Sequence, residues 1–287
     1  MITKLINYYN LENLYITKIR NKNYVKSNDR IYILYEIDKN KNKQEIIEAY
    51  KITKNYPEFE KIIFNRKNMM FTNIDNKEYI LIEKKYYKKQ IVKRIIVNDE
   101  IKYLDRSNWI RLWEKKIDYI EKTYYHIKGE NIIIDESIYY FIGMAEVAIS
   151  YIKNNSSKYN RKNEKIICSK TYDEMEIYNP LNIIVDYPER EISEYLKKIF
   201  WKNEYTEELA VKYLEKNIIN CNLSSIYARM LFPNFYFDAY LKCITNNNET
   251  EEIVKIINRL NEYENYTKLI FNTLKHASQK LDEVKWL

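Results

Sequence analysis

The sequence predicts an α+β protein of two parts, a small strand-rich N-terminal lobe and a larger helical C-terminal lobe. Two observations predict this class. Residues 1–88 contain short runs of β-branched and aromatic residues bounded by polar turns, which is typical of strands. From about residue 100 the apolar residues recur every three or four positions, as in helices that pack on a core. We therefore expect lobes of residues 1–88 and 89–287.

Strands on either side of one helix are expected in the N-terminal lobe. Ile31–Ile37 and Tyr79–Ile82 are the clearest strands, because both are rich in β-branched and aromatic residues. Lys61–Phe64 and Met70–Thr72 are shorter candidates. Between them, Lys43–Tyr56 has apolar residues at close to helical spacing. The expected order is strands, a helix, and strands again.

The C-terminal lobe is expected to be helical throughout, with polar loops between its helices. Asp105 or Ser107 can cap a helix whose apolar residues step by three or four from Trp109 to Tyr124. Pro233 must kink or restart the helix that contains it. The other expected helices are Glu136–Lys153, Glu191–Trp201, Thr206–Ile219, Leu223–Ile244 and Thr250–Leu281.

Composition argues against several classes of protein. Hydrophobic residues make up 46% and charged residues 31%, so the chain is globular rather than disordered. The net charge is +7, but acids and bases are interleaved, so nucleic-acid binding is not expected. No run of 18 apolar residues occurs, so no transmembrane segment is expected. The first residues lack the apolar core of a signal peptide, which predicts synthesis in the cytoplasm.

Cysteine and histidine are too few and too scattered for several kinds of site. Cys168, Cys221 and Cys243 form no Cys-x-x-Cys pair, so buried free thiols in a reducing compartment are expected. His126 and His276 are the only histidines, which excludes a histidine-rich metal site. Thirty tyrosines would suit oxidative cross-linking, but the excess of Ile, Lys, Asn and Tyr is explained more simply by AT-rich codons.

The signatures of a phosphotransferase are missing from the N-terminal lobe. Such an enzyme needs a glycine-rich cradle for phosphates and a strand lysine paired with a helix glutamate. Residues 1–128 contain no glycine. Leu34 and Tyr35 stand where the lysine would lie. Glu45 or Glu48 could be its partner, but without the lysine both are better interpreted as surface acids.

The segment from Cys168 to Leu196 is where catalytic groups would be expected. A His-x-Asp sequence would be needed, but Ser169-Lys170-Thr171 stands there, with Asp173 displaced from the register. Asn179 and Asn182 could help to hold Mg²⁺, but two amides and one carboxylate bind it weakly.

Asp186 is the best remaining candidate for a metal ligand, because it follows an apolar strand (NIIVD). The alternative, which we favour, is that it opens the turn before the next helix. Pro188 would then set that turn and Arg190 would pair locally.

Several stretches carry a resemblance to a known family. They are Tyr139–Tyr151 (YYFIGMAEVAISY), Ile167-Cys168, Val185–Leu196 (VDYPEREISEYL) and Ile226–Tyr240 (IYARMLFPNFYFDAY). Together they resemble the spore-coat kinase-like family of the YutH and CotS type, which is distantly related to aminoglycoside and choline kinases. The N-terminal lobe agrees with that family only in the order of its elements.

The resemblance implies a two-lobed, protein-kinase-like fold of the aminoglycoside phosphotransferase type, with a degenerate catalytic-loop region at residues 166–191. Carried over, Asp186, Arg190 and Glu191 would form the turn that buttresses this loop. Glu191 replaces the usual aspartate. If Asp186 belongs to this turn, the position of the family's metal-binding aspartate would fall near Asn179, and the metal site would be lost. If Asp186 is itself the metal ligand, it would remain without the other residues that complete a metal site.

The favoured hypothesis is a catalytically inactive kinase-like protein that acts as a scaffold in the spore coat or in coat assembly. Its partners would be other spore-coat proteins, and no catalytic, metal or cofactor residues are expected. It would be made in the mother-cell cytoplasm and then reach the coat.

Two alternatives stay open. One is an atypical small-molecule or protein kinase that uses ATP and Mg²⁺, with Asp186 and Asp173 as metal ligand and base. Lys84-Lys85 or Lys88-Lys89 would then supply a phosphate clamp. The other is a module that binds an acidic polymer or a membrane surface through its net charge.

Overall fold

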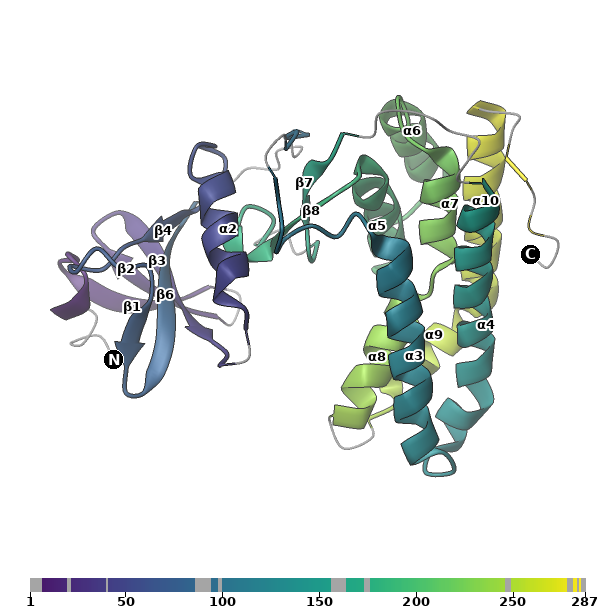
Figure 1. Ribbon diagram of the computed structural model, residues 1–287, viewed down its shortest axis with the longest axis horizontal. Helices are drawn as coiled ribbons and strands as arrows, with labels where there is room; N and C mark the ends of the chain where they lie inside the picture. Colours follow the sequence, from purple (N-terminus) through teal and green to yellow (C-terminus); the bar gives the residue numbers. More distant parts are fainter. Residues whose placement is uncertain are drawn as a thin grey trace. The chain divides into compact units, whose positions relative to one another are not determined.

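The computed structural model divides the chain into two units, which Figure 1 shows together. The first comprises residues 1–95, 99–105 and 169–184, and the second residues 96–98, 106–168 and 185–287. The first unit thus combines the strand-rich lobe with a segment from the middle of the chain. The residues described are 7–19, 22–39, 41–85, 94–97, 100–155, 164–172, 176–245, 249–277, 281–282 and 284.

The first unit is built on an antiparallel sheet. Its described strands run in the order β1-β2-β3-β6-β4, and β5 also pairs with β6. β4 pairs with the end of β6 and β5 with its beginning, so both share one side of that strand. The strands are β1 Leu14–Ile19, β2 Lys22–Ser27, β3 Arg30–Ile37, β4 Lys61–Ile63, β5 Thr72–Ile74 and β6 Lys77–Lys84.

Three of the expected strands are confirmed in β3, β4 and β6, and the fourth, expected at Met70–Thr72, begins two residues later as β5. β1 and β2 were not expected. Their sequences, LYITKI and KNYVKS, contain lysine and other polar residues, and β1 lies at an edge of the sheet where such residues are tolerated.

Both faces of this sheet are covered. Residues 31, 33, 35 and 37 of β3 face one apolar cluster with α2 (Lys43–Thr53), while residues 32 and 34 face another. This alternation follows from the two-residue period of a strand. The second face is covered by the segment that carries Tyr9 and Leu11. α2 starts at the N-cap Asn42, whose side chain accepts a hydrogen bond from the backbone of Gln44.

The strands β7 (Ile166–Ser169) and β8 (Ile183–Asp186) pair with each other, and the division between the two units falls within both. Residues 169–184 of the first unit lie between these points. They include the short 3₁₀ helix η2 (Pro180–Asn182), and Leu181 packs with the cluster beside α2.

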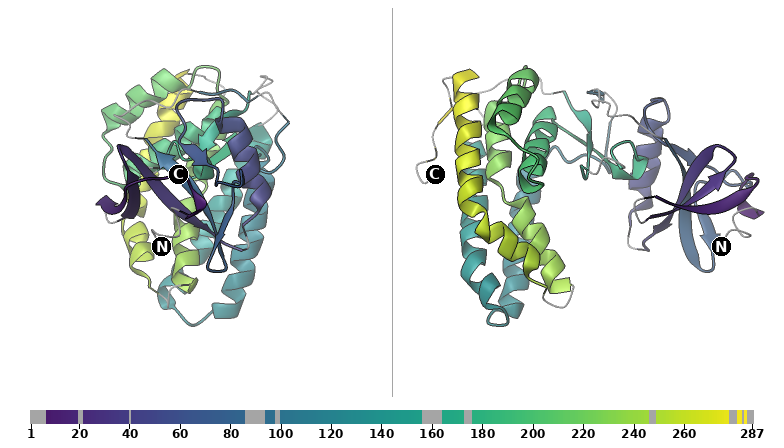
Figure 2. Two further views of the ribbon diagram at one scale, coloured as in Figure 1. Left: turned by 90° about the vertical axis from the view of Figure 1, so that its left-hand side faces the viewer. Right: turned by 180° about the vertical axis from the view of Figure 1, so that it is seen from behind.

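The second unit is a helical assembly with one large apolar core. α7 is its central helix, because all its residues are buried and it packs against α4, α5 and α10. Figure 2 shows the helices of this unit from two further directions. Among the described residues no helix is long and apolar enough to cross a membrane. The helices are α3 Trp109–Ile127, α4 Ile132–Asn155, α5 Pro188–Trp201, α6 Glu207–Asn217, α7 Leu223–Leu231, α8 Asn234–Thr245, α9 Glu251–Asn258 and α10 Leu260–Ala277.

Most expected helices are confirmed, and Pro233 does restart the chain between α7 and α8. Two expectations were wrong. The N-cap of α3 is Asn108, not Asp105 or Ser107, and it makes no side-chain cap bond. The expected helix at 250–281 is divided into α9 and α10 at Arg259. The guanidinium of Arg259 bonds the carbonyl of Phe200 at 3.1 Å and lies 4.3 Å from its ring centre, and these contacts accompany the break.

Left-handed turns in this chain are made by asparagine and aspartate. In the part of the chain that the structure describes, seven residues other than glycine have positive φ, and all are Asn or Asp, the side chains that tolerate this conformation best. Gly129, with φ of 88°, is a positive-φ glycine between α3 and α4. The seven are Asn13, Asn28, Asn68, Asp75, Asn76, Asn203 and Asn220.

Candidate functional site

The candidate site lies in the first unit, where residues 169–184 meet the sheet face that carries α2. The strand period decides which side chains reach it. Tyr35 on β3 is in phase with the buried Ile33, and Lys84 on β6 is in phase with the buried Ile82. Glu60 precedes the buried Ile62 by two residues. All three polar side chains therefore belong to the face that packs on α2.

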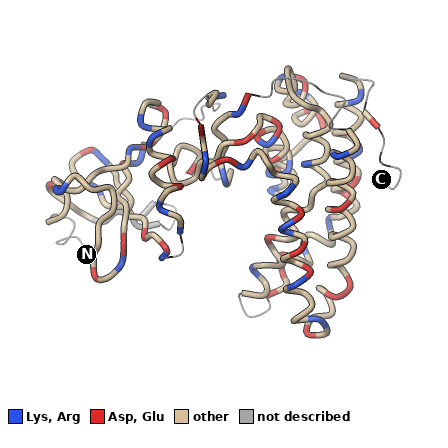
Figure 3. Tube along the Cα trace, in the orientation of Figure 1, with Lys and Arg blue, Asp and Glu red and all other residues tan. Residues whose placement is uncertain are grey.

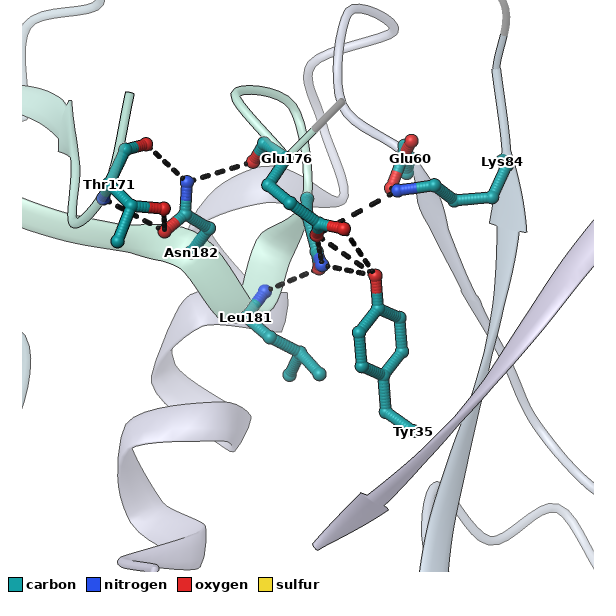
Figure 4. A network of polar contacts seen from close by, with 8 residues as sticks. Tyr35, Glu60, Lys84, Thr171, Glu176, Leu181 and Asn182 are labelled. Carbon is teal, nitrogen blue, oxygen red and sulfur yellow. Dashed lines mark hydrogen bonds and ion pairs between the residues drawn. The ribbon is translucent and has the colours of Figure 1, made fainter. Parts of the chain in front are cut away.

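Glu176 is the centre of a polar network that joins these side chains to the inserted segment (Figure 4). Its carboxylate accepts the hydroxyl proton of Tyr35 at 2.9 and 3.1 Å and the amide of Asn179 at 2.5 Å. The Lys84 ammonium lies 3.8 Å from Glu176 and 2.9 Å from Glu60. Asn179 also donates to the Tyr35 hydroxyl at 2.9 Å. We call these five residues the Glu176 network.

Asn182 and Thr171 extend the same arrangement along the inserted segment, as Figure 4 also shows. The Asn182 side chain donates to the carbonyls of Thr171 and Glu176, both at 2.9 Å. Its oxygen accepts the backbone and the hydroxyl of Thr171, both at 3.0 Å. The oxygen of Asn179 accepts the backbone of Leu181. The two amides that could have held a metal are therefore used to shape the loop.

A pocket of about 200 Å³ opens beside the network. It is smaller than the pockets of roughly 300–1,000 Å³ that hold typical cofactors. Tyr35, Glu176 and Asn182 contribute to its wall together with Glu36 and Lys41. Glu36 is bound by Lys77 at 2.8 Å. Most polar groups around the pocket are thus already bonded within the protein.

Burial changes the acid–base properties of this network. It raises the pKa of Glu60 to about 7, although the Lys84 ammonium opposes that change. Burial also raises the pKa of the Tyr35 phenol, and the charge of Glu176 raises it further. Tyr35 therefore stays a neutral donor, which suits its bond to the Glu176 carboxylate.

The two glutamates of α2 are engaged in structural contacts. Glu48 accepts the backbone N–H groups of Lys102, Tyr103 and Leu104 at 2.7–3.0 Å. It holds residues 102–104 to the helix and is more than a surface acid. Glu45 lies 3.5 Å from the Lys170 ammonium. Neither meets a lysine from β3, where Leu34 and Tyr35 stand as the sequence indicated.

The two described lysines that were proposed as a phosphate clamp bind different partners. Lys84 is 7% exposed and faces two carboxylates, so it is committed to the Glu176 network. Lys85 donates to the carbonyl of Pro57. Lys88 and Lys89 lie outside the described residues, and so does Asp173.

Asp186 lies in the second unit, fully buried at the end of β8. One Arg229 nitrogen bonds both of its oxygens, at 3.0 and 3.1 Å, and the backbone of Tyr187 donates at 2.7 Å. The Arg229 guanidinium in turn lies over the ring of Trp109 at 4.4 Å. Burial raises the pKa of Asp186, and Arg229 opposes this. The Asp186 carboxylate is thus neutralised by an arginine.

The next residues along the chain open α5, and two of them act electrostatically on Asp186 or on Cys168. α5 begins at Pro188, three residues before the expected start at Glu191, so Pro188 lies in the first turn of the helix and not in a turn before it. The backbone of Arg190 bonds the carbonyl of Tyr187. The charge of Arg190 acts on Asp186. Burial raises the pKa of Cys168 at the end of β7, and the charges of Glu191 and Asp186 raise it further. Asp186, Arg190 and Glu191 therefore share one electrostatic environment with Cys168.

All three cysteines are buried free thiols, as the sequence indicated. Among the described residues, no three His, Cys, Asp or Glu side chains are grouped so that they could hold a metal ion.

Sequence reasoning missed Arg229, Glu60 and Glu176. Arg229 lies inside the motif Ile226–Tyr240, where an arginine among predominantly apolar residues was an available signal. Glu60 is in phase with β4 and so belonged to its buried face. Nothing local marks Glu176, which meets Tyr35 from 141 positions away.

Comparison with known proteins places these features in a family. Residues 2–276 match the family described as "Spore coat putative kinase YutH". No match was found among curated proteins. An aminoglycoside phosphotransferase from Alicyclobacillus acidocaldarius is similar in structure, with a TM-score of 0.59, 8% identity, and 96% of each chain covered.

Two structures of the spectinomycin phosphotransferase APH(9)-Ia are also similar. Its AMP complex has a TM-score of 0.55 and 10% identity, covering 94% of this chain and 96% of that one. Its complex with ADP and spectinomycin has a TM-score of 0.53 and 10% identity, covering 95% and 97%. These likenesses establish an aminoglycoside phosphotransferase-like fold. The family match extends over nearly the whole chain, and the protein therefore belongs to the YutH family of kinase-like spore-coat proteins.

Proposed function

We propose that this protein is a catalytically inactive kinase-like protein that acts as an interaction scaffold in the spore coat or in its assembly. The observation that carries this proposal is the Glu176 network. Tyr35 stands where a phosphate-binding lysine would be needed, and Lys84 is bound by two carboxylates. The groups beside the pocket thus bond one another.

Three further features support the loss of phosphoryl transfer. Residues 1–128 contain no glycine to cradle phosphates. Ser169-Lys170-Thr171 replaces the His-x-Asp sequence. Asp186 is bound by Arg229, and removing several electrostatic groups together costs a large factor in rate. We propose that the protein uses neither ATP nor Mg²⁺.

The alternative kinase function would need Asp186 to exchange its arginine for a metal ion, and nothing in the described residues favours that. Binding to an acidic polymer through net charge also finds little support. Figure 3 shows lysine and arginine interspersed with aspartate and glutamate along both units.

Exposed aromatic and aliphatic side chains support a role in protein contacts. Tyr125, Ile132 and Tyr139, in the last turn of α3 and the first turns of α4, are 80%, 72% and 59% exposed. Aromatic residues are enriched in protein interfaces. We propose that the partners are other spore-coat proteins, which the protein meets after synthesis in the mother-cell cytoplasm.

A thermal-shift titration with ATP and ADP, with and without Mg²⁺ or Mn²⁺, tests the loss of nucleotide binding. A ligand specific for the folded state would add roughly 2.7 kcal/mol of stability at a hundred times its Kd. We expect no shift up to millimolar nucleotide, with an active aminoglycoside phosphotransferase as positive control. A metal-dependent shift would contradict the proposal.

A second experiment separates the scaffold from the kinase in sporulating cells. The Asp173→Asn variant should assemble into the coat like the wild type, because no catalysis is involved. Loss of function in this variant, at normal protein levels, would support the kinase. Replacing Tyr125 and Tyr139 with Ser should reduce the capture of coat proteins, whereas Tyr15→Ser, at another exposed tyrosine, should not.

A further inference from the structure

Two carboxylates share one ammonium group inside the first unit. The side chains of Glu60, Lys84 and Glu176 are 3%, 7% and 12% exposed. With both glutamates ionised the group carries one net negative charge in a place largely shielded from water. Such a charge is unfavourable in a medium of low dielectric constant. A single proton on one carboxylate would cancel it.

The burial of Glu60 depends on the inserted segment. Its backbone N–H donates to the carbonyl of Tyr178 at 3.0 Å, and the rings of Phe59 and Tyr178 meet edge to face at 6.2 Å. Glu176 and Asn179 hold the same segment to Tyr35. Detaching residues 176–182 would therefore bring Glu60 into water and separate Glu176 from Lys84.

We propose that Glu60, Lys84 and Glu176 form a proton-operated latch, which holds residues 176–182 against the sheet and loosens as the pH rises from mildly acidic to neutral. The proposal does not depend on whether the protein binds nucleotides. It concerns how firmly one segment is attached within the first unit.

The direction follows from linkage between proton binding and attachment. The pKa of Glu60 is raised by burial to about 7, whereas a detached Glu60 would have its ordinary value of 4.5. The attached state therefore holds a proton that the detached state has lost between these values. Attachment weakens by about tenfold per pH unit in this window, or roughly three-hundredfold over the whole window, and levels off above it.

Other charged and titratable groups surround the latch from each neighbouring element and set its midpoint. They are Glu58 and Lys61 beside Glu60, Glu83 and Lys85 around the end of β6, Tyr178 on the inserted segment, Tyr35 on β3 and Tyr24 on β2.

Hydrogen exchange of the Glu60 amide measures the latch directly, because this N–H is protected by the Tyr178 carbonyl. Rates are measured between pH 5 and 8 and corrected for the exchange of an unstructured peptide at each pH. The expected protection falls by about tenfold per unit up to pH 7 and is then constant. Protection independent of pH across this range would overturn the proposal.

The Glu60→Gln variant lacks the carboxyl group that takes up the proton of the latch and should show protection that does not change with pH. Glu78→Gln, on β6 but paired with the exposed Lys43, should keep the wild-type slope. A slope retained in Glu60→Gln would contradict the latch. A ¹³C NMR titration of the wild-type Glu60 carboxyl carbon needs no variant. A midpoint near 7 is expected, and a midpoint near 4.5 would refute the proposal.

Discussion

At the scale of single residues, Arg229 decides what Asp186 can do. The sequence left two interpretations open for this aspartate, a metal ligand or a residue that opens a turn. Its oxygens are bound by a buried guanidinium, which neither interpretation anticipated, and by the backbone of Tyr187 just before α5. Which arginine reaches a carboxylate 43 positions away depends on the packing of α7. Local sequence cannot reveal that pairing.

Replacing Arg229 with Met should destabilise the second unit strongly, because it leaves Asp186 buried without its partner. We expect a loss of about 3–5 kcal/mol in the free energy of unfolding, measured with urea. Lys116→Met, which breaks the partly exposed pair with Asp238, should cost less than about 1 kcal/mol.

A double variant, Asp186→Asn with Arg229→Met, should recover part of the stability lost by Arg229→Met, since no unpaired charge remains. A loss below 1 kcal/mol for the single arginine variant would show that Asp186 readily becomes neutral or hydrated.

At the scale of elements, local patterns predicted most of the fold and failed where a distant contact intervened. β3 and α3 follow from their two- and 3.6-residue periods. The residues of α3 that the spacing indicated are buried, namely Trp109, Trp113, Ile117, Ile120 and Tyr124. The division between α9 and α10 coincides with contacts of Arg259 with Phe200, which lies 59 positions away. The edge strand β1 lacks a clear apolar pattern.

α2 offers a test of how one side chain fixes a neighbouring segment. Glu48→Gln should weaken the bonds to the backbone of Lys102, Tyr103 and Leu104, because an amide oxygen accepts less strongly than a carboxylate. We expect a loss of about 2 kcal/mol in stability and faster hydrogen exchange at these three amides.

Glu45→Gln is the matched control on the same helix. It removes one partly exposed ion pair with Lys170 at 3.5 Å and should cost less than about 1 kcal/mol. Unchanged exchange at residues 102–104 in Glu48→Gln would mean that other contacts hold this segment.

At the scale of the whole molecule, the division into strand-rich and helical parts could be predicted from composition and period alone. The Glu176 network could not, because it brings together β3, β6, the start of β4 and a segment from beyond residue 168. The absence of glycine from residues 1–128 and the absence of a lysine from the strand at Ile31–Ile37 were visible in the sequence. The hydrogen bonds and ion pairs of the Glu176 network could be recognised only in the structure.

Buried tyrosines should make the protein sensitive to alkali. Burial raises the pKa of each of these phenols, so the folded state keeps protons that the unfolded state loses above pH 10. Each retained proton lowers stability by about 1.4 kcal/mol per pH unit in that range. The tyrosines concerned are Tyr9, Tyr227, Tyr236, Tyr240, Tyr263 and Tyr266.

Phenolate absorbance and circular dichroism, followed together from pH 9 to 12, check this. The last tyrosines should ionise in the same cooperative step in which the helical signal is lost. Complete ionisation of all tyrosines while the helical signal persists would contradict the expectation.

The asparagines with positive φ show which structural roles of glycine another residue can fill. Asparagine can replace glycine in a left-handed turn, because its side chain tolerates that backbone conformation. It cannot replace glycine in a phosphate cradle, where any Cβ stands in the way of the ligand. A genome that drifts toward AT-rich codons exchanges one residue for the other. An exchange of this kind would preserve the left-handed turns of a kinase-like fold but not a glycine-rich phosphate cradle.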